Sequence, residues 1–417
     1  MNTLADEIEE YLDEYEKQWT LSGTVLVARE GKVLFNKAYG YANLEHRVPN
    51  TTDTKFRIWS LTKSFTAMAI MMLQERGLLA LEDDIGRYIP ELADKGISIL
   101  HLLHHTSGLV NYTSLPGYHF RLNKLRLSHE DIIRLLVGKP LQFKPGTSFD
   151  YTNSSYYLLG MIVENVMGLT FEQFLHSSIL QPLGMNNTGM FHHTKVIPGM
   201  SSGYHSSWDD LIPCEYLNMS SSFTAGAMYS TVEDLLKWDQ ALYMEKLVTK
   251  AALDRAFEPS FTYGFGWFID ERFHRRRIHH SGAYRGHRSD MQRFPDDQIT
   301  IIMLTNYDFV PILRLTERIA GLVFGQKPII PVRPERYPLA DEVYARYMGT
   351  YEGEGFDCKA VVDRNEHQWY FVFNDDQYIP FYPISETRFH HTWYEWDCEF
   401  SVDGKGGIFF LGMRKTK

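Results

Sequence analysis

The sequence predicts an α/β protein of the α+β type, with helices packed on an antiparallel sheet and a smaller β-rich region after them. Two strand-like stretches, 23–29 and 32–38, are separated by a turn signal and predict a hairpin. The apolar stretch 64–76 has helical length and ends at a glycine, so it predicts a buried helix. Further strand-like stretches between 263 and 305 predict a meander, which is expected to join the hairpin in one sheet.

The first predicted element is an amphipathic helix. Apolar residues recur at helical spacing from Leu4 to Trp19, and acidic residues fill the other face. The segment lacks the basic start and the uninterrupted apolar core of a signal peptide, and no uncharged apolar run approaches the roughly 20 residues of a membrane span. We therefore expect a cytoplasmic protein with no membrane span, or a secreted or periplasmic one only if a leader has been removed.

The length of 417 residues exceeds what one hydrophobic core usually serves, so two domains are expected. Residues 1–325 are assigned to the larger domain, and the proline-rich segment 326–338 predicts a stiff linker. The aromatic, β-rich remainder, 339–417, predicts a small β-barrel. Its role stays open between a wall of the active site, a dimerisation surface and a stabilising appendage, so a homodimer is one of the expected assemblies.

Composition and charge favour a globular protein and argue against other classes. The chain is 44% hydrophobic and 23% charged, which is typical of a folded domain. Its net charge of −10 argues against nucleic-acid binding. The three cysteines, Cys214, Cys358 and Cys398, do not make a disulfide framework, and we assign them no chemistry.

Ser60 and Lys63 stand three residues apart where the apolar helix is expected to start. Residues three apart on a helix are neighbours, about 5–6 Å apart at Cβ, so the lysine amine is expected beside the serine hydroxyl. A serine becomes a nucleophile when a positioned base takes its proton, and desolvation disfavours the charged form of a buried lysine. The alternative is a helix start with a serine cap and a solvated lysine.

A second fragment, Tyr151-Thr152-Asn153, lies in a loop just before a predicted helix. The Tyr151 phenol is a candidate base, provided that a cation such as Lys63 favours the phenolate. The alternative is a tyrosine packed over a helix start, with a neighbouring polar residue as the cap.

A third fragment, His280-Ser281-Gly282-Ala283, ends a predicted short strand. Gly282 permits a backbone amide and a substrate to approach closely, because glycine has no Cβ. By itself this fragment carries little information, and its value lies in its position after the other two.

In this order and spacing the three fragments resemble the β-lactamase and penicillin-binding-protein superfamily, in particular its class C β-lactamase-like branch of esterases and D-peptidases. The signature of that family is S-x-x-K, then Y-x-N, then K-T-G or H-x-G. Stretches such as 102–109 and 224–231 look similar to the same family, and the resemblance covers roughly residues 5–325. It implies a β-lactamase/transpeptidase-like fold with a five-stranded antiparallel sheet flanked by helices and an all-helical subdomain at about 60–220. It also implies a lipocalin-like C-terminal barrel.

The resemblance implies a catalytic set in which Ser60 is the nucleophile and Lys63 and Tyr151 handle the proton. It further implies a set of residues that bind the substrate or the oxyanion, namely Asn153, His280, Ser281, Gly282 and Ala283. The backbone amides of Ser60 and Ala283 would form the oxyanion hole. Arg285 is a candidate for binding a substrate carboxylate, because its planar guanidinium matches that group.

The expected function is that of a serine hydrolase with an acyl-enzyme at Ser60. Its substrate would be an ester or amide of a small molecule or short peptide, as in a carboxylesterase or a D-amino-acid peptidase or carboxypeptidase. The first alternative is a β-lactam-hydrolysing or penicillin-binding enzyme. His280 stands where that pattern has lysine and is mostly neutral near pH 7, which disfavours capture of a β-lactam carboxylate. The second alternative is a non-catalytic acyl sensor or scaffold with the same fold.

Two other motifs compete with this interpretation. Residues 199–203 match the G-x-S-x-G elbow of α/β-hydrolases around Ser201, but they lack the buried strand before it and the helix after it. His101, His104 and His105 have the spacing of a zinc site, whereas the resembled family usually has structural histidines here. We therefore predict no metal and no cofactor.

Overall fold

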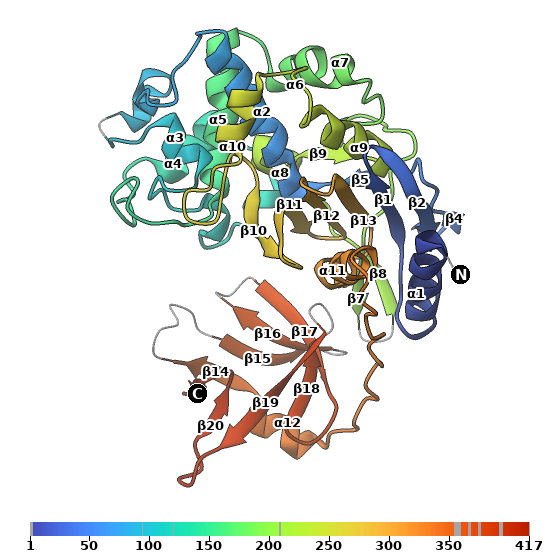
Figure 1. Ribbon diagram of the computed structural model, residues 1–417. Helices are drawn as coiled ribbons and strands as arrows, with labels where there is room; N and C mark the ends of the chain where they lie inside the picture. The colour runs from blue at the N-terminus through green and yellow to red at the C-terminus, as the bar shows by residue number, and fades with distance from the viewer. Residues whose placement is uncertain are drawn as a thin grey trace.

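The computed structural model describes residues 3–93, 95–119, 121–207, 210–353, 360–365, 368–373, 377–391 and 395–416. Figure 1 shows a larger part, in which helices surround a sheet, and a smaller barrel joined to it by an extended segment. The fold is mixed α and β with a C-terminal barrel, as the sequence predicts.

The sheet of the larger part is antiparallel and has the strand order β10-β11-β12-β13-β1-β2. Its strands are β1 (Gly23–Arg29), β2 (Lys32–Tyr39), β10 (Phe268–Arg272), β11 (Arg275–Tyr284), β12 (His287–Phe294) and β13 (Ile299–Thr305). The N-terminal hairpin joins the later meander through the pairing of β1 with β13. The expected number of five strands is wrong, because β10 pairs with β11 and adds a sixth strand at the edge.

Strand β11 is longer than the sequence suggested. We expected a short strand that ends before the third fragment, but β11 continues through His280 and Ala283 to Tyr284. Pairing with β12 sustains it, since Gly282 lies opposite Ser289 and Ala283 opposite Arg288. The third fragment therefore lies within a strand of the sheet.

The two faces of the sheet bury two separate hydrophobic clusters. Leu26 and Ala28 of β1 pack with the helices of the larger cluster, whereas Val25 and Val27 pack on the opposite face with the first and eleventh helices. This alternation follows from the two-residue period of a strand. The sheet is thus buried on both sides and forms a rigid base.

The helices lie mainly between 62 and 256, in and just beyond the region where a helical subdomain is predicted. In chain order they are α1 (Leu4–Gln18), α2 (Thr62–Glu75), α3 (Ile99–Leu103), α4 (His129–Leu136), α5 (Asn153–Met167), α6 (Phe171–Leu175), α7 (Gln181–Leu183), α8 (Phe223–Gly226), α9 (Val232–Ala241), α10 (Lys250–Ala256), α11 (Ile312–Val323) and α12 (Asp341–Tyr347). Short strands in the larger part are β3 (Tyr41–Asn43), β4 (Val48–Pro49), β5 (Phe56–Arg57), β6 (Gly189–Met190), β7 (Tyr204–Ser207), β8 (Asp210–Pro213) and β9 (Met228–Ser230). Helices α2 and α5 cross the centre of the larger cluster, with their middle turns fully buried.

The C-terminal part is a closed antiparallel barrel whose strands follow one another in chain order. They are β14 (Gly349–Glu352), β15 (Ala360–Asn365), β16 (Gln368–Phe373), β17 (Gln377–Pro383), β18 (Arg388–His391), β19 (Trp396–Val402), β20 (Ile408–Phe410) and β21 (Met413–Lys415). Aromatic rings fill the interior: Tyr344 stacks on Trp369 at 4.0 Å between centroids, and Tyr347 on Phe400 at 4.2 Å. A barrel of this size is just wide enough for side chains to fill.

The barrel contacts the larger part through α1 and α11. Glu395 lies 2.5 Å from the Arg318 guanidinium and accepts a hydrogen bond of 3.0 Å from the Tyr15 hydroxyl. Trp19 donates to the carbonyl of Pro331 in the linker at 2.8 Å and packs against the His390 ring. The linker is thus held against the larger part at Trp19.

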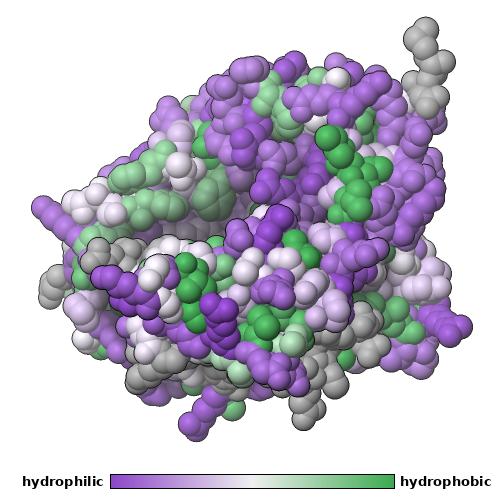
Figure 2. All heavy atoms as spheres, turned by 90° about the horizontal axis from the view of Figure 1, so that it is seen from below, coloured by the Kyte–Doolittle hydropathy of each residue, from purple (hydrophilic) through white to green (hydrophobic). Residues whose placement is uncertain are grey.

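The surface on the barrel side is largely hydrophilic, and its hydrophobic residues form separate groups (Figure 2). No single described helix is both long and apolar enough to cross a membrane, although α5 together with residues 171–183, bent by 81°, reaches that length and composition. Cys214 and Cys398 are free thiols. Cys358 lies outside the described residues.

Candidate active site

The candidate nucleophile, Ser60, lies in a 3-10 turn, Trp59–Leu61, that runs directly into α2. Leu61 and Thr62 have right-handed helical angles, so Ser60 and Lys63 lie on one helical path. Nζ of Lys63 is 3.0 Å from Oγ of Ser60, which is hydrogen-bonding distance. The three-residue spacing therefore places the amine and the alcohol in direct contact.

The Lys63 side chain is completely buried. Its Nζ atom has two further acceptors, Oδ1 of Asn153 at 2.9 Å and the carbonyl of Ala225 at 2.8 Å. None of these partners, among the described residues, is a carboxylate. Burial lowers the pKa of Lys63 well below its usual value. The site therefore favours a neutral amine, which can accept the Ser60 proton.

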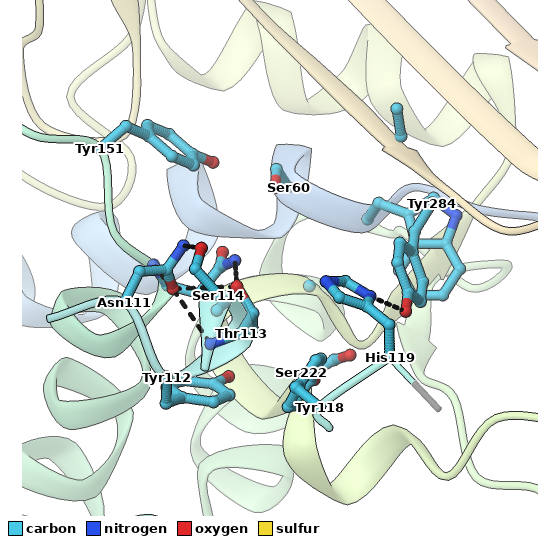
Figure 3. Close-up of a pocket in the computed structure, with 15 residues that line it drawn as sticks. Ser60, Asn111, Tyr112, Thr113, Ser114, Tyr118, His119, Tyr151, Ser222 and Tyr284 are labelled. Atoms are coloured by element: carbon cyan, nitrogen blue, oxygen red, sulfur yellow. Dashed lines mark hydrogen bonds between the residues drawn. The ribbon is translucent and has the colours of Figure 1, made fainter. Parts of the chain in front are cut away.

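Tyr151 faces the same serine. Its hydroxyl points toward Ser60 (Figure 3), and its ring lies 4.8 Å from Nζ of Lys63. The His105 and Phe268 rings hold it in place, at 4.4 and 6.0 Å between centroids. Burial raises the pKa of Tyr151, so the phenol is protonated at rest. Tyr151 was expected to act as the base only if Lys63 carried a positive charge. Burial disfavours the charged form of Lys63, so that condition is not favoured here.

Asn153 is the first residue of α5, and its neighbour Thr152 caps the helix. Oγ1 of Thr152 accepts from the Ser154 amide at 3.1 Å, which leaves the Asn153 side chain available for the site. Nδ2 of Asn153 donates to Oγ1 of Thr113 at 3.0 Å, and its Oδ1 faces Lys63. Asn153 thus fixes the orientation of the lysine amine.

Strand β11 passes next to the serine turn at Gly282. A Cβ atom at this position would lie 2.1 Å from the Ile58 carbonyl oxygen and 2.9 Å from the Ser60 nitrogen. Only glycine permits this approach. It places the backbone of Ala283 beside that of Ser60, the arrangement that an oxyanion hole of two amides requires.

His280 is 1% exposed and lies behind Tyr151. Its Nδ1 donates to the Ser281 carbonyl at 2.7 Å, and its Nε2 accepts from the Tyr263 hydroxyl at 2.9 Å. Burial lowers the pKa of His280 to about 3. The imidazole is therefore a neutral support for the tyrosine, placed away from the position where a substrate would bind.

A pocket of about 230 Å³ opens in front of Ser60. Figure 3 shows Tyr151 directed toward Ser60 from one side, and His119 and Tyr284 joined by a hydrogen bond on the other. The described residues that line it are Trp59, Ser60, Asn111, Tyr112, Thr113, Ser114, Tyr118, His119, Tyr151, Asn153, Ser222, Ala225, Gly226, Ala283 and Tyr284. The wall combines aromatic rings with neutral hydrogen-bonding groups, which suits an acyl group of modest size.

A family model described as Beta-lactamase matches residues 4–321 of this chain, which is more than half of it. The chain belongs to the Beta-lactamase family. Penicillin-binding protein 4* of Bacillus subtilis (strain 168) is 31% identical over 411 residues, covering 91% of this chain and 90% of that protein.

Several solved structures are similar to this chain in fold. A D-amino acid amidase from Ochrobactrum anthropi SV3 is 25% identical with a TM-score of 0.68, over 77% of this chain and 98% of that one. An octameric penicillin-binding protein homologue from Pyrococcus abyssi is 25% identical with a TM-score of 0.67, over 99% of both chains. The second likeness therefore includes the C-terminal barrel.

Several pocket residues of this Beta-lactamase family member were missed at the sequence level. Asn111, Thr113 and His119 lie in a loop after α3 that has no regular pattern, and Tyr284 directly follows the third fragment. Nδ1 of His119 is 2.5 Å from the Tyr284 hydroxyl, and Nδ2 of Asn123 donates to the same hydroxyl at 2.9 Å. Tyr284 could have been predicted from its position next to Ala283. No sequence pattern pointed to the three loop residues.

Arg285 and Ser281 are not among the described residues that line the pocket. The Arg285 guanidinium is 3.9 Å from the Glu215 carboxylate and is about one fifth exposed. Burial is the main cause that lowers the pKa of His119, and the nearby Arg285 charge acts in the same direction. Binding of a substrate carboxylate by Arg285 stays a prediction.

The competing motifs have other surroundings. Ser201 is buried, and its Oγ donates to the Lys55 carbonyl at 2.9 Å and lies 3.0 Å from Nε2 of His287. The three clustered histidines each have a partner of their own: His101 the Ser98 amide, His104 the Tyr263 carbonyl and His105 the Thr152 amide. The His105 ring also packs on Tyr151, and its Nε2 is buried without a hydrogen-bond partner among the described residues.

Proposed function

We propose that this protein is an active serine hydrolase that cleaves ester or amide bonds through an acyl-enzyme on Ser60. The single observation that carries the proposal is the contact of 3.0 Å between Ser60 Oγ and a completely buried Lys63. A buried amine whose pKa is lowered is an effective base, because it is unprotonated near neutral pH. The membership of the Beta-lactamase family supports it.

The proposed reaction starts with transfer of the Ser60 hydroxyl proton to the neutral Lys63 amine. The Ser60 oxygen attacks the substrate carbonyl carbon, and the developing oxyanion is bound by the backbone amides of Ser60 and Ala283, a contribution of roughly 3–4 kcal/mol per donor. The leaving group takes the proton from Lys63 through the Tyr151 hydroxyl. A water molecule then loses a proton to the same pair, attacks the acyl carbon and releases the acid and Ser60.

The pocket supports a substrate with a short, uncharged acyl group. Its volume of about 230 Å³ is below the range of about 300–1,000 Å³ for drug-sized ligands. Its neutral amide and hydroxyl groups, including Asn111 and Asn153, suit a carbonyl or amide of the acyl part. We therefore rank short esters first and D-amino-acid amides or short peptides second, the latter because a structural relative is a D-amino acid amidase.

A β-lactam-hydrolysing or penicillin-binding activity is the second candidate, favoured by the 31% identity to penicillin-binding protein 4*. It ranks lower because His280 is neutral and buried, so it provides no cation for the carboxylate of a β-lactam. Arg285 is a cation in the turn after β11, and Glu215 already lies beside it.

The test uses intact-protein mass spectrometry with a fluorophosphonate and a penicillin, followed by a panel of p-nitrophenyl esters, D-aminoacyl anilides and nitrocefin. We expect a single adduct on wild type that is lost in Ser60→Ala and retained in Ser201→Ala, a buried serine outside the pocket. Loss of the adduct in Ser201→Ala alone would refute the assignment. An adduct without turnover of any substrate would favour the non-catalytic acyl sensor.

We also propose that the chain self-associates, since a structural relative that spans 99% of both chains is described as octameric. Light scattering coupled to size-exclusion chromatography tests this, with a homodimer as the smallest expected assembly. A monomer at micromolar concentration would contradict it.

A further inference from the structure

Three side chains with metal-binding atoms meet at one end of the sheet, outside the pocket. His205 belongs to β7, Cys214 follows β8, and Asp308 follows β13. Their ligand atoms, a ring nitrogen, a thiol sulfur and a carboxylate oxygen, all lie within 4.8 Å of one another. None of these residues takes part in the proposed hydrolysis.

The backbone holds the three residues together independently of their side chains. The Tyr204 amide donates to the Asn306 carbonyl at 2.9 Å, and the Cys214 amide donates to the Gly203 carbonyl at 2.9 Å. The Asp308 amide donates to the Tyr204 carbonyl at 3.2 Å. The main chain at the three ligands is thus held by bonds to residues 203, 204 and 306, so the adjustment that a metal requires falls on the side chains.

The side chains are oriented toward a common point. Nδ1 of His205 contacts Oδ2 of Asp308, and the Gly286 amide donates to the same oxygen at 3.0 Å. A Cβ atom at Gly286 would lie 2.4 Å from the Cys214 sulfur, so the thiol is packed directly on that turn. The Gly286 contact is the kind of outer hydrogen bond that orients a carboxylate ligand.

Buried polar atoms of this cluster lack partners that a cation could supply. Asp308 is 6% exposed, and Nε2 of His205 is buried with no hydrogen-bond partner among the described residues. A divalent cation would compensate both the carboxylate and a thiolate at once.

We propose that His205, Cys214 and Asp308 bind one Zn²⁺ ion. A nitrogen, a sulfur and an oxygen donor are the mixture that zinc accepts, whereas Mg²⁺ and Ca²⁺ prefer oxygen alone. Zinc bonds of about 2.0–2.3 Å put tetrahedral ligands roughly 3.3–3.8 Å apart, so the widest pair must close by about 1 Å. Binding replaces the thiol proton of Cys214, which is released to solvent, and water fills the fourth position.

The position of the site gives the ion a structural role. Gly286 lies three residues after Ala283, in the turn between β11 and β12. A zinc ion would tie the β7–β8 hairpin, the end of β13 and this turn together. The strand that carries the Ala283 amide would thereby be stiffened at its end.

The test uses untagged full-length protein dialysed against a chelator. We expect wild type to bind one Zn²⁺ per chain by calorimetry and elemental analysis, and Co²⁺ to give a near-ultraviolet thiolate-to-cobalt band. The Cys214→Ser variant should lose the band, and both Cys214→Ser and Asp308→Asn should bind Zn²⁺ at least tenfold more weakly. Cys398→Ser, which removes the buried thiol of the barrel, should bind as wild type does.

Binding that is equal in Cys214→Ser and wild type, or the lack of any binding at micromolar Zn²⁺, would overturn the proposal. Thermal unfolding of the metal-free proteins shows whether each variant is folded, and added Zn²⁺ should raise the midpoints of wild type and Cys398→Ser more than those of Cys214→Ser and Asp308→Asn. These measurements do not depend on hydrolysis, so they stand apart from the test of Ser60.

Discussion

Nδ1 of His119 and the hydroxyl of Tyr284 are 2.5 Å apart, and their contact joins the loop after α3 to the end of β11. Burial, aided by Arg285, lowers the pKa of His119 to about 4, so above that pH the neutral ring accepts a hydrogen bond from the Tyr284 hydroxyl. The Trp59 ring packs edge-on against Tyr284 at 5.3 Å between centroids. These residues close one end of the pocket that faces Ser60.

Replacing Tyr284 with alanine should therefore extend the pocket and shift the substrate preference toward longer acyl groups. One methylene in an apolar pocket is worth about 1–3 kcal/mol, so the ratio of kcat/KM for hexanoate to that for acetate should rise at least tenfold. A series of p-nitrophenyl esters measures this. The matched control is Tyr284→Phe, which keeps the ring and should keep the wild-type ratio. An unchanged ratio in Tyr284→Ala would show that the pair does not limit the acyl group.

The pH dependence of kcat/KM should report the lysine. Lys63 acts as a base only when it is neutral, and burial lowers its pKa well below 10.5, so the rate should rise with pH and level off below that value. Burial lowers the pKa of His280 to about 3, so its protonation should produce no limb between pH 5 and 8. Stopped assays in buffers of constant ionic strength test both points. A rate that still rises through pH 10 would contradict the neutral lysine.

Gly282→Ala should inactivate the protein. The new methyl group would lie 2.1 Å from the Ile58 carbonyl oxygen, so β11 must move away from the Ser60 turn and open the oxyanion hole. We expect a loss of at least 100-fold in kcat, consistent with the removal of one oxyanion donor, and a loss of about 1–3 kcal/mol in unfolding free energy. The control is Gly404→Ala, where a Cβ meets nothing within 4 Å. Activity near wild type in Gly282→Ala would refute the close approach.

Glu395→Gln should weaken the contact between the barrel and the larger part. Glu395 is 3% exposed and lies 2.5 Å from Arg318, so the substitution leaves the guanidinium without its counter-charge. The expected loss is roughly 1–3 kcal/mol in unfolding free energy, measured by urea denaturation. Because all described pocket residues lie between 59 and 284, kcat/KM should stay within about twofold of wild type. The control is Glu386→Gln, because Glu386 is an exposed residue of the barrel. Equal unfolding free energies of the two variants would rule out the Glu395–Arg318 ion pair as a stabilising contact.

Some features of the fold and of the candidate site follow from local sequence patterns alone. The contact of Ser60 with Lys63 follows from their spacing on one helical turn, and the alternation of β1 follows from the period of a strand. The extension of β11 through the third fragment did not follow, because strand length depends on the pairing partner, here β12. Similarly, His280 was expected at the substrate, but the rings of Tyr263 and Tyr151 bury it.

The sequence by itself determined the family, the mixed fold with a C-terminal barrel, and the residue types of the candidate site, because these are written in motifs and short-range periodicity. Only the tertiary structure decided which protonation state is favoured for Lys63 and Tyr151, since their pKa values depend on burial by residues distant in the chain. It also decided the far wall of the pocket and brought together His205, Cys214 and Asp308. Desolvation and convergence are properties of the packed chain, and no local pattern encodes them.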